Sequence, residues 1–243
     1  MEKPNNISDL DFSILKNLYP NNMDEVIKKL NANYPVQYLI GNVNFYGYQI
    51  NVDERVLIPR FETEWLVDKT IKLIKELDLK PKIIDICTGS GAIAIALSKE
   101  LDCEVTALDI SKPAIDLAIE NTILNNANVK YLIKDIKNCD IEGKYNVIIS
   151  NPPYLKKEDK VAPQTKYEPQ ISLYANDNGL EFYKIIIDKS RSILEDRFLI
   201  AFEIGDLEGD DIINYAKTVY PNANIFCQKD LNNYERYLFI VND

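Results

Sequence analysis

The sequence of 243 residues contains no histidine, and this absence removes most imidazole chemistry. Histidine is the commonest general base and a frequent transition-metal ligand, and serine or cysteine triads depend on it. The four cysteines, Cys87, Cys103, Cys139 and Cys227, are too widely spaced to form a CxxC pair. We therefore expect no metal site and no disulfide framework.

Positive charge is also in short supply, since 28 lysines and arginines stand against 38 aspartates and glutamates, for a net charge of −10. A domain that grips a phosphate backbone normally presents a basic stripe. The balance therefore argues against direct nucleic-acid binding. It is compatible with a role in solubility or with a basic partner.

Long apolar runs are missing as well. No stretch approaches the roughly 18 apolar residues that a membrane span requires. Met1 to Asp11 are polar and acidic, without the basic start and apolar run of a secretory signal. We expect a cytoplasmic protein that does not associate with membranes.

The first 80 residues change texture twice. Apolar residues at helical spacing in 7–31, interrupted at 19–22, predict two short helices. Aromatic and β-branched residues in 36–58 predict a β-hairpin, with Asp53-Glu54-Arg55 as its polar turn. A helix is expected over 62–77, with Trp65 in the core.

After Pro81, short apolar runs alternate with longer helical ones, which predicts βαβ units. Strands are expected at 82–86, 103–108, 129–133, 145–149, 197–204, 223–228 and 235–241. Helices are expected near 90–100, 112–126, 179–195 and 208–218. This pattern indicates an α/β, Rossmann-like fold, a seven-stranded, mostly parallel sheet with helices on both faces. The final two strands are too close for a crossover helix, so they pair antiparallel or lie apart. The predicted division is a short helical N-terminal segment (1–35), a hairpin linker (36–60) and the main domain (61–243).

A glycine-rich turn follows the first strand of this domain, at Asp85-Ile86-Cys87-Thr88-Gly89-Ser90-Gly91. Gly89 and Gly91 lack a Cβ where the backbone can approach a ligand, and the helix that follows offers its N–H groups. The dinucleotide pattern GxGxxG is incomplete, because Cys87 and Ala94 stand at two of its glycine positions. The turn alone does not identify its ligand.

Three aspartates indicate which kind of ligand the turn binds. Asp109 ends the next strand, where it can accept hydrogen bonds from ribose hydroxyls. Asp85 suits a cofactor with a cationic ammonium and sulfonium better than an anionic pyrophosphate, although it could instead cap the helix. Asp135 follows the third strand at the expected adenine rim, or it is a plain turn aspartate.

The fourth strand ends at Asn151-Pro152-Pro153-Tyr154, on the sheet edge where ligands bind in open α/β folds. An amide nitrogen is a poor nucleophile, so it must be aligned with the methyl sulfonium and its hydrogens must find acceptors. The Asn151 side-chain oxygen and the Pro152 carbonyl can accept them, the prolines stiffen the loop, and Tyr154 can cover the planar group. The alternative is a proline turn that only caps the strand.

Several separated blocks together resemble the HemK/PrmC release-factor glutamine N5-methyltransferases, a family of class I methyltransferases. They are Tyr38 to Gly41, Phe45 to Gly47, Leu57 to Glu64, Asp85 to Gly91, Asn151 to Tyr154, Tyr167 to Gln170 with Gly179-Leu180, and Lys229 to Leu231. Asn-Pro-Pro-Tyr alone is shared with nucleic-acid amino-methyltransferases, whereas the Pro59-Arg60-Phe61-Glu62-Thr63-Glu64 block is more specific to this family.

The resemblance implies methyl transfer from S-adenosylmethionine to the glutamine of a Gly-Gly-Gln loop in peptide chain release factors, with S-adenosylhomocysteine as product. It places the methyl donor against Cys87 to Gly91, Asp109, Ile136 and Asn151, and the glutamine amide at Asn151 to Tyr154. Further pocket candidates are Phe45, Pro59, Arg60, Glu62, Thr63 and Glu64. For Arg60, Glu62 and Glu64, a charged helix start is the alternative.

The sequence departs from the family pattern at several places. Phe61 stands where the family usually has proline, Cys87 where it has glycine or cysteine, and Ile136 where it often has an aromatic residue. About 35 residues precede the first matching block, whereas the family normally carries a longer helical N-terminal domain that helps to engage the release factor. Two competing functions remain open: an N6-adenine type of nucleic-acid methyltransferase, and a non-catalytic module that binds S-adenosylmethionine.

Overall fold

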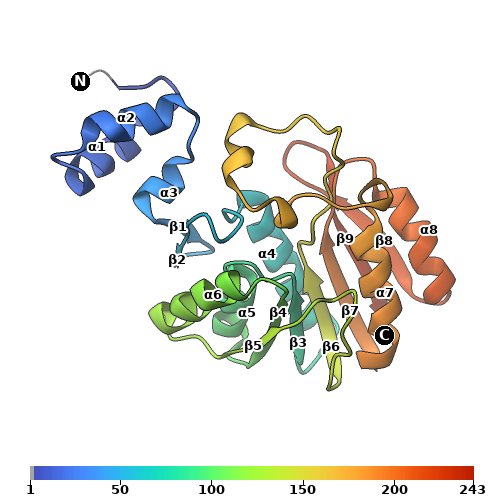
Figure 1. Cartoon of the computed structure of the whole chain (residues 1–243). Coiled ribbons are helices and arrows are strands. Elements are labelled where there is room, and N and C mark those ends of the chain that lie inside the picture. Colours follow the sequence, from blue (N-terminus) through green and yellow to red (C-terminus); the bar gives the residue numbers. More distant parts are fainter. Residues whose placement is uncertain (1–2) are drawn as a thin grey trace.

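The computed structural model describes residues 3–243, so the first two residues of the predicted N-terminal segment lie outside it (Figure 1). The helices of this described chain are α1 (Asp9–Leu18), α2 (Met23–Asn31), α3 (Val36–Ile40), α4 (Phe61–Glu76), α5 (Ala92–Leu101), α6 (Lys112–Asn125), α7 (Glu181–Ile193) and α8 (Gly209–Val219), with short 3-10 turns η1 (Pro163–Tyr167), η2 (Gln170–Ser172) and η3 (Asp177–Gly179). The strands are β1 (Asn42–Phe45), β2 (Tyr48–Asn51), β3 (Ile83–Ile86), β4 (Val105–Asp109), β5 (Val129–Ile133), β6 (Tyr145–Ser150), β7 (Leu194–Glu203), β8 (Asn224–Lys229) and β9 (Glu235–Asn242).

Within residues 3–243, seven strands form one sheet in the order β5-β4-β3-β6-β7-β9-β8. β3, β4, β5, β6 and β7 run parallel, and β9 runs antiparallel to both of its neighbours. The predicted seven-stranded, mostly parallel sheet is therefore confirmed. Its strand order reverses between β3 and β6, the position at which open α/β sheets form a ligand crevice beyond the strand ends.

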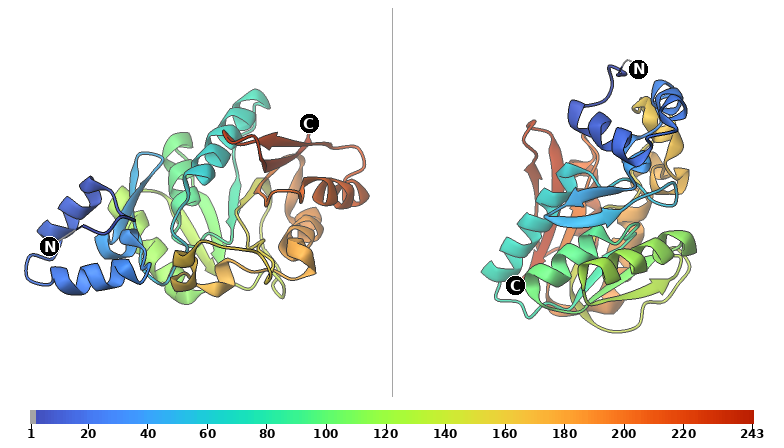
Figure 2. Two further views of the ribbon diagram at one scale, coloured as in Figure 1. Left: turned by 90° about the horizontal axis from the view of Figure 1, so that it is seen from above. Right: turned by 90° about the vertical axis from the view of Figure 1, so that its left-hand side faces the viewer.

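Helices cover both faces of the sheet (Figure 2). α4, α5 and α6 pack on one face in a core that includes Leu66, Ile95 and Leu117. α7 and α8 pack on the other face with Ile187 and Ile212. The strands between them are apolar on both sides, as expected for a parallel sheet buried twice.

The N-terminal helices have a hydrophobic cluster of their own, made by Ile7, Phe12, Leu15, Met23, Val26, Leu30 and Leu39. The short helix α3 joins this cluster to the main core. Leu39 packs in the N-terminal cluster, whereas the neighbouring Tyr38 packs in the main core and donates a hydrogen bond to the Val56 carbonyl at 2.6 Å.

Three local predictions are wrong. Residues 36–40 form the helix α3, whereas they were expected in the β-hairpin. The hairpin turns at Tyr46-Gly47, between β1 and β2, and not at Asp53-Glu54-Arg55. Both turn residues have positive φ, which matches the right-handed twist of the paired strands. Trp65 is not core: it is 36% exposed, because the apolar stripe of α4 runs through Leu66, Val67 and Ile71.

None of the helices in the described part of the chain is both long and apolar enough to cross a membrane.

Candidate active site

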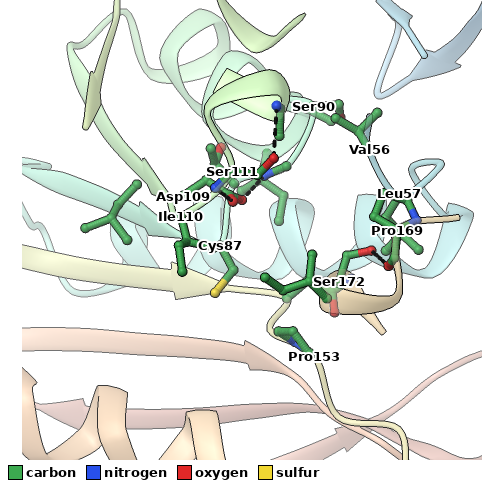
Figure 3. Close-up of a pocket in the computed structure, with 18 of the residues that line it drawn as sticks. Val56, Leu57, Cys87, Ser90, Asp109, Ile110, Ser111, Pro153, Pro169 and Ser172 are labelled. Atoms are coloured by element: carbon green, nitrogen blue, oxygen red, sulfur yellow. Dashed lines mark hydrogen bonds between the residues drawn. The ribbon is translucent and has the colours of Figure 1, made fainter. Parts of the chain in front are cut away.

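A cavity of about 240 Å³ opens at the carboxyl ends of β3, β4 and β6 (Figure 3). The glycine turn after β3 and the end of β4 form one wall, and Asn151 and Pro153 border it after β6. Segments 55–60 and 169–172 complete the enclosure from parts of the chain distant in sequence. The cavity therefore lies at the reversal of strand order.

The two glycines of the turn have different roles. Gly89 has a φ of +54°, and a Cβ added there would meet nothing within 4 Å, so its backbone is open to a ligand. Gly91 has a φ of +81°, and a Cβ there would lie 2.6 Å from the Tyr131 hydroxyl and 3.1 Å from the Ala118 Cβ. Gly91 is thus required for packing of the turn against α6 and β5, and it does not line the cavity.

Asp109 lies on the cavity wall at the end of β4. One carboxylate oxygen accepts the Gly89 N–H and the other the Ser111 N–H, both at 2.9 Å. Burial raises the pKa of Asp109, and these backbone donors oppose that rise. The contacts hold the carboxylate against the glycine turn, and each oxygen keeps a second lone pair.

Asp85 is fully buried behind the turn and does not line the cavity. Its Oδ2 accepts the Thr88 hydroxyl at 2.5 Å, and its Oδ1 has no hydrogen-bond partner among residues 3–243. Burial raises the pKa of Asp85 to about 7. Asp85 therefore supports the turn from below, with Thr88 between it and the cavity.

Asp135 and Ile136 both line the cavity after β5. Asp135 accepts hydrogen bonds from the Lys137 N–H at 2.9 Å and the Asn138 amide at 2.7 Å, so it also stabilises its own turn. The two interpretations of Asp135 are therefore compatible. Ile136 is 3% exposed and supplies an apolar surface.

The Asn151 loop is anchored at its start, where the Ser150 hydroxyl donates to the Ile86 carbonyl at 2.5 Å. The Asn151 Nδ2 donates to the Thr63 Oγ1 at 3.2 Å, and that hydroxyl donates to the Glu203 Oε2 at 2.6 Å. Pro152 is buried, and neither it nor Tyr154 lines the cavity. Burial raises the pKa of the Tyr154 phenol.

An ion pair between Arg60 and Glu168 holds the segment that covers the cavity. The Arg60 guanidinium lies 2.8 and 2.6 Å from the two oxygens of Glu168, which is 3% exposed. The Ile58 N–H also donates to Glu168 at 3.2 Å. Because Pro169, Ile171 and Ser172 line the cavity directly after Glu168, this pair holds the covering segment in place.

The cavity brings together most of the residues predicted for the site. Those on its lining are Phe45, Pro59, Arg60, Thr63, Cys87, Thr88, Gly89, Ser90, Asp109, Asp135, Ile136, Asn151 and Pro153. Those off the lining are Glu62, Glu64, Asp85, Gly91, Pro152 and Tyr154. Glu62 lies at the start of α4, where its backbone carbonyl accepts the Tyr237 hydroxyl.

Sequence reasoning missed a second set of residues. On the lining they are Arg55, Val56, Leu57, Ala92, Ile93, Leu108, Ile110, Ser111, Ala114, Lys134, Lys137, Pro169, Ile171, Ser172 and Phe182, and behind it they are Glu168 and Glu203. Some of these residues could have been identified from the sequence. Ser111 follows Asp109 as the N-cap of α6, and Glu168-Pro169 belongs to a block already noted for its resemblance. Glu203 only ends a buried strand.

No cluster of three or more cysteine, aspartate or glutamate side chains in residues 3–243 is arranged to hold a metal ion.

Comparison with known proteins gives three findings. Residues 64–166 match the family described as Methyltransferase small domain. The chain is 40% identical over 214 residues to the release factor glutamine methyltransferase of Streptococcus pneumoniae, covering 86% of this chain and 75% of that protein. It is 36% identical over 222 residues to the one of Lactococcus lactis, covering 90% and 81%.

A crystal structure of a methyltransferase from Pyrococcus furiosus is similar in fold, with a TM-score of 0.60 at 18% identity over 92% of this chain and 98% of that one. The likeness of the two structures supports the class I methyltransferase fold.

Proposed function

The chain belongs to the release factor glutamine methyltransferase family, and from that premise we propose that it methylates the side-chain amide nitrogen (N5) of the Gly-Gly-Gln glutamine in peptide chain release factors. S-adenosylmethionine, when bound, supplies the electrophilic methyl group and leaves as S-adenosylhomocysteine. The amide nitrogen gains the methyl group and loses one proton.

The cavity fits this donor. Gly89 leaves room for close backbone approach, Asp109 offers free lone pairs to ribose hydroxyls, and Ile136 gives an apolar surface for a flat ring. The unpartnered Oδ1 of Asp85 adds negative potential behind the turn, which suits a cationic ligand. We propose Cys87 to Ser90, Asp109, Asp135, Ile136 and Asn151 as the donor-binding residues, with Gly91 shaping the turn through its packing and Asp85 acting from behind.

One observation carries the proposal: Asn151 and Pro153 border the same cavity as Gly89 and Asp109. An amide held at the Asn151 loop is therefore adjacent to a ligand held at the glycine turn. We propose that the Asn151 Oδ1 and the Pro152 carbonyl accept its two hydrogens and that Tyr154 covers its planar face. Such alignment can account for a large part of a rate enhancement.

The test is transfer of a labelled methyl group to a purified release factor. Label should appear in the wild-type factor and disappear when the Gly-Gly-Gln glutamine is replaced by alanine. In the enzyme, Asn151→Ala should lower kcat by at least about 10²-fold if positioning matters as argued. A non-catalytic module would give no label with any enzyme variant.

The Asn-Pro-Pro-Tyr loop also favours a second candidate, methylation of an amino group on nucleic acid. Parallel incubations with DNA, RNA and the release factor separate the two. The net charge of −10 favours the protein substrate. Label in nucleic acid alone would overturn the proposed function.

We also propose the division into residues 1–35, 36–60 and 61–243, and action in the cytoplasm. The separate hydrophobic cluster of α1 and α2 supports a distinct N-terminal segment, and Leu39 of α3 extends this cluster into the proposed linker. We further propose that these helices help to dock the protein substrate. The Tyr167 hydroxyl donates to the Ala32 carbonyl at 3.0 Å, and this contact ties the end of α2 to the segment that covers the cavity, next to Glu168.

A further inference from the structure

A buried chain of hydrogen bonds ends at Asn151. It begins at the Glu203 carboxylate at the end of β7, passes through the Thr63 hydroxyl in the first turn of α4, and reaches the Asn151 amide after β6. Glu203 is 2% exposed and Thr63 is 5% exposed. Three separate elements thus converge behind one side chain of the site.

The order of donors along this chain follows from its acidic end. An ionised carboxylate only accepts, so the Thr63 hydroxyl must donate to Glu203 and can then only accept from Asn151. The Asn151 Nδ2 therefore points toward Thr63. Its Oδ1, at the other end of the planar amide group, points away from Thr63.

The Glu203 carboxylate is enclosed at the end of β7, where its residue is 2% exposed. Burying an ionised carboxyl group opposes folding unless the charge is compensated. Arg236, whose charge favours ionised Glu203, is itself bonded to the Ile204 carbonyl at 3.0 Å and lies 3.5 Å from Asp230. The Thr63 hydroxyl donates directly to the Glu203 Oε2 at 2.6 Å, and a side-chain hydrogen bond from Asn151 also favours the ionised carboxylate.

We propose that Glu203 and Thr63 are positioning residues, which fix the side-chain amide of Asn151 with its oxygen facing the substrate nitrogen. The inference rests on the proposed function for its substrate, and it concerns residues that act through the orientation of Asn151. With the amide reversed, Asn151 would present N–H groups to a substrate amide that also offers N–H groups. The pair would repel.

The kinetic test compares two substitutions at Thr63 with a matched control. Thr63→Val keeps the shape and removes the hydroxyl, so kcat should fall at least about tenfold, the equivalent of one net hydrogen bond. Thr63→Ser should restore most of that loss. Thr70→Val makes the same change in the same helix, where the Thr70 hydroxyl bonds only to the Leu66 carbonyl at 2.7 Å, and should leave kcat unchanged.

Donor affinity, measured by calorimetry, should fall less than kcat in Thr63→Val, because Thr63 and Asn151 form only part of the cavity lining and the contacts of the glycine turn and Asp109 stay in place. A loss confined to donor affinity would overturn the proposal. So would equal kcat losses in Thr63→Val and Thr70→Val, or no recovery in Thr63→Ser, since either result indicates a packing effect.

A second readout needs no substrate. In protein labelled with ¹⁵N, the Asn151 side-chain NH₂ protons should exchange slowly in the wild type and in Thr63→Ser, and quickly in Thr63→Val. Rapid exchange in all three overturns the hydrogen-bond order. If the release factor gains no label while these protons behave as expected, the proposed function fails and the positioning of Asn151 stands.

Discussion

Cys87 has a backbone φ of +63°, a left-handed conformation that costs a residue with a Cβ about 1–2 kcal/mol. It is the first residue of the turn after β3, and the shape of the cavity wall depends on that conformation. Strain is thus located where the ligand is expected to bind, as is common at functional sites.

The stabilities of two variants truncated at Cys87 should therefore differ in the reverse of the usual order. Cys87→Gly should be more stable than Cys87→Ala by about 1 kcal/mol, because both lose the thiol but only glycine is free of the strain. The free energy of unfolding from urea titration measures the difference. At Cys103, which has ordinary backbone angles, alanine should be the more stable, and the same ranking at both sites would contradict the strain.

Glu203 should make the rate depend on pH. Burial raises the pKa of Glu203 to about 7, and only the ionised form enforces the Thr63 and Asn151 orientation. Neither a glutamine amide nor a sulfonium titrates near neutrality, so kcat should rise with pH through about 7 and then level off. The titratable and charged groups that face Glu203 are Glu62 from α4, Tyr154 from the loop after β6, Tyr183 from α7, and Arg236 and Tyr237 from β9.

The replacement Glu203→Gln should remove that pH dependence and lower kcat at pH 8, while the protein becomes more stable there. Higher stability with lower activity separates positioning from a purely structural role. Burial also raises the pKa of Glu208 to about 7, so Glu208→Gln is the matched control and should keep the rise. A flat wild-type profile, or a rise lost only in Glu208→Gln, would contradict the assignment.

At the scale of elements, the segment before α4 and the segment after η1 meet over the cavity through Arg60 and Glu168. The two residues are 108 positions apart, and no local pattern predicts that they pair. Their partnership depends on how the whole sheet places α4 and the loop after β6. This explains why the Pro-Arg block was expected near the site while its partner was not.

Breaking the pair of Arg60 and Glu168 should loosen the segment that covers the cavity. Glu168→Gln should weaken binding of the methyl donor by roughly tenfold, with a smaller effect on kcat, because removing one member of a buried charge pair commonly costs more than 2 kcal/mol and Arg60 is partly exposed. Calorimetry with S-adenosylmethionine measures the change. Glu195→Gln removes the exposed bridge to Lys82 and should leave affinity unaltered. Equal effects of both substitutions would argue against a closing role.

Local patterns predicted the helices and strands of the main domain because alternating apolar runs and helical stripes are local properties. The errors at the hairpin turn and at Trp65 have local causes too. Asp53-Glu54-Arg55 is polar and does turn, with the Asp53 carboxylate accepting the Arg55 N–H, but Tyr46-Gly47 alone has the two positive φ angles that reverse paired strands. Trp65 lies beside the buried face of α4, which is formed by Leu66, Val67 and Ile71.

At the scale of the molecule, the sequence left one feature of the sheet undecided, which is the place of the last two strands. β9 lies between β7 and β8, and its central residues from Tyr237 to Val241 are buried. β8 lies at the edge and is mostly half-buried. The continuous apolar run of β9 and the mixed composition of β8 are consistent with these places, and α8 packs against both strands.

The same fold encloses several acidic groups in a chain of net charge −10, and this should govern its stability. Burial raises the pKa of Asp85, Glu203 and Glu208 to about 7 each, above their unfolded values. Between those values the native state binds more protons than the unfolded state, so stability is greatest below the unfolded pKa and is lost as pH rises through 7. Carboxylates whose pKa is lowered, such as Asp53 and Asp230, act only at lower pH.

We therefore expect the free energy of unfolding to be lower at pH 8 than at pH 5.5, by at least about 2 kcal/mol from the three groups together. Urea titrations at the two pH values measure this, and Glu208→Gln should reduce the difference without changing the site. Bound S-adenosylmethionine should oppose this loss of stability at high pH. Its cationic groups near Asp85 favour the ionised carboxylate, so the folded protein should bind S-adenosylmethionine more tightly at pH 8. If stability were equal at both pH values, the carboxyl groups would have to titrate normally, and the burial that places Asp85 and Glu203 behind the site would be wrong.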